Sequence, residues 1–189
     1  YGSAEIINSN GGFVRVFRTK NKSGYIFGSL LMKYEINMQT VMLDEKLLVN
    51  DWCNFDSSLK YSPDHDLFMQ VASRFPVGVI EDVLVKYRVH NRSSSMKMLK
   101  IVSENNNKTF DKILSENPKL LNTYSKEVSY AYKKGNYFDA IYYVSDLRYK
   151  DALNSISIIK FSSYQFFCLY LMILIRLPKN IIMKILRRS

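Results

Sequence analysis

The sequence predicts an α/β fold, with strands and a helix in its first half and helices in its second half. Short apolar segments at residues 4–7 and 13–18 flank an Asn-Gly-Gly turn, which is the pattern of a β-hairpin. Apolar residues recur at helical spacing after Pro63, and a valine-rich run at residues 77–90 predicts one or two strands. From about Ser95 onward the pattern is helical.

Three further segments complete the expected order of elements. Residues 36–48 are rich in β-branched and apolar side chains, which predicts a strand leading into a turn. Residues 122–147 predict two helices that meet at Gly135, where a glycine is a common helix end. The apolar run at residues 166–175 is only ten residues long, whereas a membrane-spanning helix needs about twenty.

The composition excludes several classes of protein. Of the 189 residues, 47% are hydrophobic and 23% are charged, which is typical of a globular chain and not of a disordered one. The two cysteines, Cys53 and Cys168, lie far apart and outside any zinc-binding spacing, so we expect free thiols and no disulfide framework. The net charge of +10 indicates an anionic partner, either nucleic acid or an acidic membrane surface.

The positive charge gathers at the carboxyl end, where no acidic residue follows Asp151. Beyond Pro178, four apolar residues lie among four cations: Ile181, Ile182, Ile185 and Leu186 among Lys179, Lys184, Arg187 and Arg188. This combination predicts that residues 161–189 form a basic amphipathic helix on an anionic membrane surface. The alternative is a terminal helix that packs on its own domain. Residues 99–160 form the expected helical region before it.

Asp64 and Asp66 flank His65 at the start of the helix that follows Pro63. A carboxylate in the first turn of a helix is stabilised by free backbone amides, so capping alone accounts for either acid. An ionised carboxylate at such a junction also serves as a general base. Spacing alone does not separate these interpretations. A metal site built from these three consecutive residues is disfavoured, because their side chains do not converge on one helix face.

Two segments, "FDSSLKYSPDHDLFMQVASRF" at residues 55–75 and "EDVLVKYRVHNRSSS" at residues 81–95, occur in an informative order. Together they resemble the second half of the family 2 glycosyltransferases, the inverting group with a Rossmann-like GT-A fold. The resemblance covers residues 1–98. It implies that these residues are the C-terminal, acceptor-side portion of a GT-A catalytic domain, followed by an α-helical C-terminal region.

The resemblance also implies roles for individual residues. Asp64 holds the place of the catalytic base, and Asp66 supports the loop or caps the helix. Arg88 or His90 binds the diphosphate of the donor, and His90 alternatively contacts a metal ion. The family uses a divalent cation, Mn or Mg, whose ligands are expected mostly outside this chain, with no other metal site within it.

The function expected from this resemblance is sugar transfer from a nucleotide-sugar donor to a glycan or lipid-linked acceptor, with inversion, in cell-surface polysaccharide synthesis. The expected location is cytoplasmic, peripheral on the inner face of the cell membrane. No segment of this sequence, which starts at Tyr1, corresponds to the nucleotide-binding half of the family's enzymes. We therefore expect the isolated chain to be inactive. The alternative is a basic nucleic-acid-binding or helical interaction module without catalytic activity. Nucleic acid is the less favoured partner, because the cations lie beside an aliphatic run.

Overall fold

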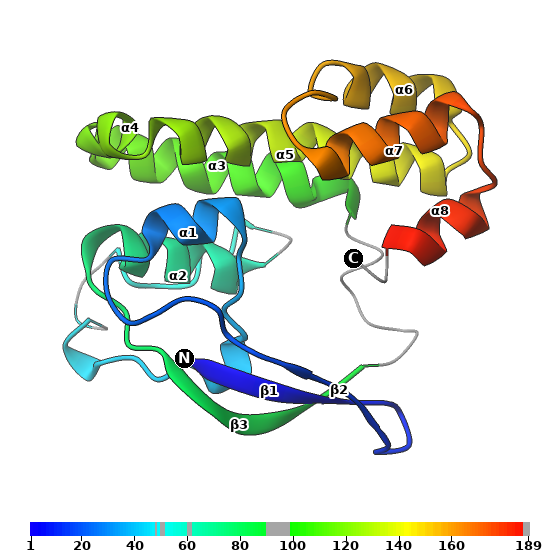
Figure 1. The fold of residues 1–189 in the computed structure, drawn as a ribbon. Helices are drawn as coiled ribbons and strands as arrows, with labels where there is room; N and C mark the ends of the chain where they lie inside the picture. Colours follow the sequence, from blue (N-terminus) through cyan, green and yellow to red (C-terminus); the bar gives the residue numbers. More distant parts are fainter. Residues whose placement is uncertain (48, 50–51, 60–61, 90–98, 187–189) are drawn as a thin grey trace.

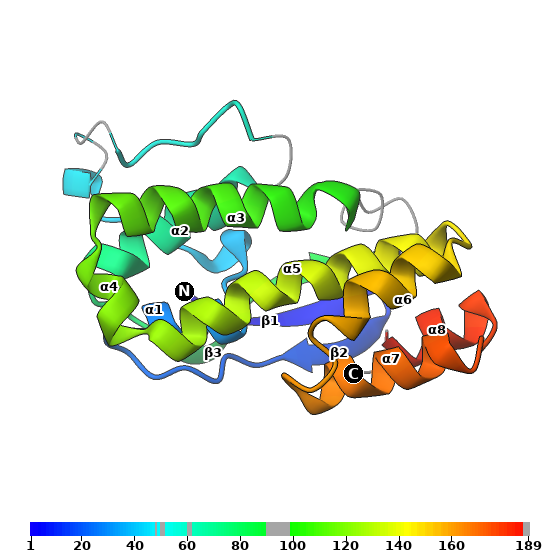
Figure 2. The same cartoon turned by 90° about the horizontal axis from the view of Figure 1, so that it is seen from above.

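The computed structural model describes the chain except for residues 48, 50–51, 60–61, 90–98 and 187–189 (Figure 1). The described part forms a three-stranded mixed sheet and eight α-helices, which confirms the expected α/β class. Figure 1 shows three layers: the sheet, then α1 and α2, then the long helices α3 and α5. Helices α6, α7 and α8 lie at one end of α5 (Figure 2).

The sheet has the strand order β2-β1-β3, with β1 at its centre. Strands β1 (Gly2–Ile7) and β2 (Phe13–Phe17) pair antiparallel, which confirms the predicted hairpin. Its turn places Gly11 at a φ of 85°, a conformation that glycine adopts without steric cost. Strand β3 (Ile80–Arg88) pairs parallel with β1, so a long connection separates two neighbouring strands.

That connection contains helices α1 (Phe27–Met32) and α2 (Pro63–Arg74). The prediction of a strand at residues 36–48 is wrong. The chain there forms the 3₁₀ helices η1 (Met38–Thr40) and η2 (Glu45–Leu47). The side chain of Asn37 accepts a hydrogen bond from the Gln39 amide, and the Thr40 hydroxyl donates to the Asn37 carbonyl. These local bonds satisfy polar groups in a turn and compete with an extended strand.

Helices α3 (Leu99–Glu116), α4 (Lys119–Thr123) and α5 (Ser125–Ser145) form the layer above α1 and α2. The predicted break at Gly135 is wrong, because α5 runs through this residue without interruption. A Cβ at Gly135 would lie 3.1 Å from the Cβ of Ser103 in α3. This glycine therefore allows two helices to approach closely and does not end one.

The chain ends in helices α6 (Tyr149–Ser157), α7 (Tyr164–Leu174) and α8 (Lys179–Leu186). Within residues 161–189 a single helix was expected, whereas the described residues form two. The break contains Arg176, at a φ of 54°, and Pro178, which cannot continue the hydrogen-bonding of the preceding helix. In the part of the chain that the structure describes, none of the helices is long and apolar enough to cross a membrane.

Among the described residues, buried apolar side chains form two clusters. The first extends from Tyr1 to Ala131 and joins α1 and α2 to α3, α4 and the first half of α5. The second extends from Ala140 to Ile182 and joins the rest of α5 to α6, α7 and α8. Helix α5 therefore connects the two clusters. The functional divisions expected at residues 98 and 160 stay predictions.

Gly28 provides a test of the packing between α1 and α5. A Cβ at this position would lie 2.7 Å from the ring of Tyr124, which packs edge-on against Phe27. We predict that Gly28→Ala lowers the free energy of unfolding by about 1–2 kcal/mol, measured by urea denaturation, although alanine favours helix. The matched control is Gly78→Ala, because a Cβ there meets no atom within 4 Å. A stabilised Gly28→Ala variant would contradict this packing.

Candidate active site

A cavity of about 620 Å³ opens beside the carboxyl ends of β1 and β3. Ile6 and Tyr87, which are partners in the parallel register, both line it. In open α/β sheets, ligands bind outside the carboxyl ends of parallel strands. The position of the cavity in the sheet therefore makes it the candidate active site.

Asp64 lines this cavity from the first turn of α2. The helix begins at Pro63, a favourable first residue because proline has no amide hydrogen to leave unpaired. Ser62 holds the N-cap position, so Asp64 lies inside the helix and is not its cap. Its carboxylate is half-buried, and no hydrogen bond or ion pair joins it to another described residue. A carboxylate that lines a cavity and has no such partner among the described residues is available to bind a ligand.

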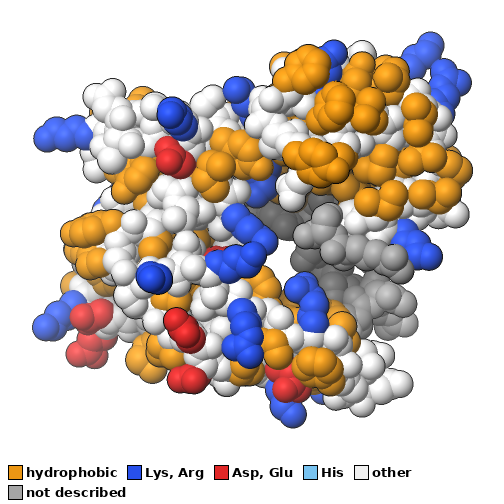
Figure 3. Space-filling model, in the orientation of Figure 1, with side chains coloured by type: hydrophobic (Ala, Val, Ile, Leu, Met, Phe, Trp, Pro, Cys, Tyr) orange, Lys and Arg blue, Asp and Glu red, His pale blue; other side chains and the backbone are white. Residues whose placement is uncertain are grey.

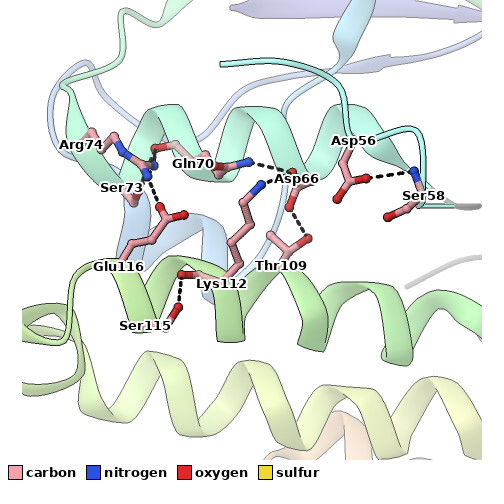
Figure 4. A network of polar contacts seen from close by, with 10 residues as sticks. All are labelled: Asp56, Ser58, Asp66, Gln70, Ser73, Arg74, Thr109, Lys112, Ser115 and Glu116. Atoms are coloured by element: carbon pink, nitrogen blue, oxygen red, sulfur yellow. Dashed lines mark hydrogen bonds and ion pairs between the residues drawn. The ribbon is translucent and has the colours of Figure 1, made fainter. Parts of the chain in front are cut away.

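Asp66, two residues further on, is only 1% exposed and fully engaged (Figure 4). Its carboxylate accepts hydrogen bonds from Gln70 Nε2 at 2.7 Å and from Thr109 Oγ1 at 2.8 Å. The ammonium of Lys112 lies 3.8 Å away. Two of these partners belong to α3, so Asp66 holds α2 against α3, and its expected supporting role in the site stays a prediction.

His65 lies in the core between two aromatic rings. Its ring centroid is 4.6 Å from that of Tyr34 and 6.0 Å from that of Phe110. Burial lowers the pKa of His65 to about 4, and the nearby cation Lys134 contributes to the shift. The imidazole is therefore neutral at pH 7 and acts as a packing residue.

The structure does not bring Arg88 to the cavity. Its Nη1 donates to the carbonyl oxygens of Asn8 at 3.1 Å and Ser9 at 3.0 Å, which fastens the β-hairpin turn to β3. His90 lies outside the described residues. Diphosphate binding by Arg88 or His90 therefore stays a prediction, as does metal binding by His90.

Among the described residues, no group of three or more histidine, cysteine or acidic side chains is arranged to hold a metal ion. Glu35 and Asp64 both line the cavity, but Glu35 is committed to other contacts. The part of the chain that the structure describes therefore does not supply a set of ligands for the divalent cation that the resemblance implies.

Tyr34 and Glu35 are among the residues of the cavity wall that sequence reasoning missed. The hydroxyl of Tyr34 is buried without a hydrogen-bond partner among the described residues. Burial raises its pKa, and the nearby Asp64 carboxylate raises it further, so the hydroxyl remains a proton donor. Both residues follow an apolar run, and no local pattern separates them from exposed polar residues.

Glu35 organises the loops on one side of the cavity. It is 5% exposed, and its Oε1 accepts hydrogen bonds of 2.9 Å from the Tyr1 hydroxyl and from the amides of Lys20 and Asn21. One carboxylate thus joins the start of β1 to the segment that follows β2. Its role in the site is to position backbone.

No family model, curated protein or solved structure matches this chain.

The two acids of α2 should differ sharply in their contribution to stability. We predict that Asp66→Ala lowers the free energy of unfolding by about 2–4 kcal/mol, because it leaves the buried Thr109 hydroxyl and Gln70 amide without their acceptor. We predict that Asp64→Ala changes it by less than about 1 kcal/mol, because no partner is lost. Equal losses in chemical denaturation would contradict the distinct environments of the two carboxylates.

His65 makes the stability of the fold depend on pH. Below the ordinary pKa of 6.5 the unfolded chain gains a proton that the folded chain does not bind until about pH 4. We therefore predict that the free energy of unfolding falls as the pH drops from 6.5 to 4, by an amount on the order of 3 kcal/mol from this residue. His65→Phe should flatten this part of the profile, measured by urea denaturation at each pH.

The control for this prediction is His90→Gln, because the chain has only two histidines. This variant should retain the pH dependence of the unmodified chain. If His65→Phe retained it as well, a neutral buried His65 would be contradicted.

Proposed function

We propose that residues 1–189 carry the acceptor side of an inverting glycosyltransferase of the GT-A type. The observation that supports this most directly is that both sequence motifs meet at one cavity: Asp64 and Phe55 from the first, and Tyr87 from the second. The motifs lie on different elements, and their convergence beside the carboxyl ends of β1 and β3 is what a shared site requires.

Asp64 is the proposed general base of this reaction. Its carboxylate takes the proton of an acceptor hydroxyl while that oxygen attacks the anomeric carbon of the donor sugar. A new carbon–oxygen bond forms on the face opposite the leaving group, and the bond to the donor phosphate breaks. The electron pair of that bond leaves with the nucleoside diphosphate. A divalent cation, when bound, would offset the charge that develops on this diphosphate.

The cavity lining suits a saccharide acceptor. The aromatic rings of Phe17, Tyr34, Phe55 and Tyr87 offer apolar surface to the carbon–hydrogen faces of a sugar. Arg15, Asn37 and Gln39 lie in the same wall and offer polar groups to its hydroxyls. An acceptor that is a glycan or a lipid-linked sugar, as in cell-surface polysaccharide synthesis, matches this combination.

The donor side of the site is proposed to lie outside residues 1–189. Val83 and Leu84 of β3 are apolar, yet they are 43% and 45% exposed. Parallel sheets are normally covered on both faces. These uncovered apolar residues of β3 support an expectation that further structure continues or covers this sheet, and that residues 1–189 alone are inactive.

The decisive variant is Asp64→Asn in a protein that includes the donor side. We predict that this change lowers the rate of sugar transfer by about 10²–10⁴-fold, because the amide cannot accept the acceptor proton. Donor binding should stay nearly unchanged. The measurement is release of nucleoside diphosphate and glycosylated product across a panel of nucleotide sugars, with donor affinity measured by calorimetry.

The matched control is Asp44→Asn, because Asp44 is an exposed acid outside the cavity. It should transfer sugar at the unmodified rate. Undiminished transfer by Asp64→Asn would remove Asp64 as the base and return it to a local role in α2. Absence of transfer with every donor, together with tight salt-dependent binding of nucleic acid, would favour the non-catalytic alternative.

A further inference from the structure

Helix α7 is apolar on all sides, yet only one side of it is covered. Phe166, Leu169 and Ile173 are buried in the second cluster. On the opposite side, Leu171 and Leu174 are 40% and 48% exposed. A helix that is apolar all round is normally enclosed by protein or lipid, so the outer side of α7 lacks a partner in residues that the structure describes.

The uncovered surface continues on both sides of α7. Phe161 is 82% exposed and stacks on Phe167, with ring centroids 6.0 Å apart. In α8, Ile181 and Ile185 are exposed one turn apart, while Ile182 is buried in the second cluster. We name this surface the α7–α8 face and define it by six exposed residues: Phe161, Tyr164, Leu171, Leu174, Ile175 and Ile181. Figure 3 shows hydrophobic side chains gathered over α6, α7 and α8.

Cations accompany this apolar surface. Arg176 and Lys184 are exposed in the segment that joins α7 to α8 and in α8 itself. The ammonium of Lys160 lies 5.2 Å from the ring centroid of Phe161 and 4.7 Å from that of Tyr170. No acidic residue follows Asp151 in the sequence, so nothing from this segment offsets the positive charge.

We propose that the α7–α8 face docks on an anionic lipid bilayer, with α7 lying in the plane of the interface. Apolar side chains that enter the acyl boundary, together with cations that meet lipid phosphates, are the two requirements of an interfacial helix. At 11 residues α7 is too short to span a bilayer. The surface differs from the amphipathic helix expected from sequence, because it includes exposed apolar residues in and next to α7, while Ile182 of α8 is buried.

The test uses residues 1–189 and vesicles of phosphatidylcholine with or without 30% phosphatidylglycerol, separated by sedimentation. We expect binding to the anionic vesicles only. The pair Arg176→Gln and Lys184→Gln should weaken it by about fivefold for each charge removed. The pair Leu171→Ser and Ile175→Ser should weaken it by roughly tenfold or more. Circular dichroism confirms that each variant is folded.

Matched controls lie elsewhere on the surface. The pair Lys22→Gln and Lys119→Gln removes the same charge from exposed positions outside the face, and Met42→Ser removes an apolar side chain that is 93% exposed. Both should bind like the unmodified chain. Equal loss in the controls would show attraction by net charge alone and would overturn the proposal.

A fluorescence measurement separates insertion from adsorption. In a Trp52→Phe background, which removes the chain's own tryptophan, Leu174→Trp should give a blue-shifted emission with anionic vesicles, whereas Met42→Trp should not. An unshifted Leu174→Trp spectrum on bound vesicles would overturn insertion. A dimer in ultracentrifugation that is lost in Leu171→Ser, with no vesicle binding by the unmodified chain, would assign the face to a second copy. The test needs no transfer activity, so its outcome is independent of the proposed function.

Discussion

The buried carboxylate of Asp66 is the contact on which the candidate site depends. It joins α2 to α3 through Thr109 and Lys112, and an ion pair between Arg74 and Glu116 repeats the connection at the far end of α2 (Figure 4). Helix α3 in turn packs along α5, which also forms part of the second cluster. The orientation of α2 is therefore set from the helical layer above it, whereas the cavity it faces belongs to the sheet below.

The geometry of the helix explains why two acids so close in sequence differ. Successive residues are rotated by about 100° around a helix axis, so residues two apart point to nearly opposite sides. Once Asp66 points at α3, Asp64 points away from it, toward the sheet and the cavity. Between them, His65 packs against Tyr34 and Phe110. One turn of helix thus holds a structural carboxylate, a neutral packing residue and an uncommitted carboxylate.

The sequence predicted the fold correctly where turn residues and helix-start signals determine the local structure. The Asn-Gly-Gly turn indicated the hairpin, and Pro63 with the following apolar stripe indicated α2. Local rules failed at Gly135, where glycine serves a contact with Ser103 and not a helix end. They also failed at residues 36–48, where Asn37 closes a turn within an apolar segment.

The site was predictable only in part. The motif pointed to Asp64 and to Asp66, but the different environments of the two acids follow from contacts with α3, which lies more than 30 residues away in sequence. Tyr34 and Glu35 enter the cavity wall through tertiary packing and carry no local signal. Arg88 holds the hairpin turn in this structure, a contact that a motif on β3 does not reveal.

The most direct test of this account is chemical labelling of carboxylates in residues 1–189. A carbodiimide with an amine nucleophile modifies accessible acids, and mass spectrometry gives the extent at each position over time. We expect that Asp64 is modified readily in the folded chain, while Asp66 is protected until the chain unfolds, and that a saccharide acceptor slows labelling at Asp64. Rapid labelling of Asp66, or protection of both acids in the absence of a ligand, would contradict this expectation.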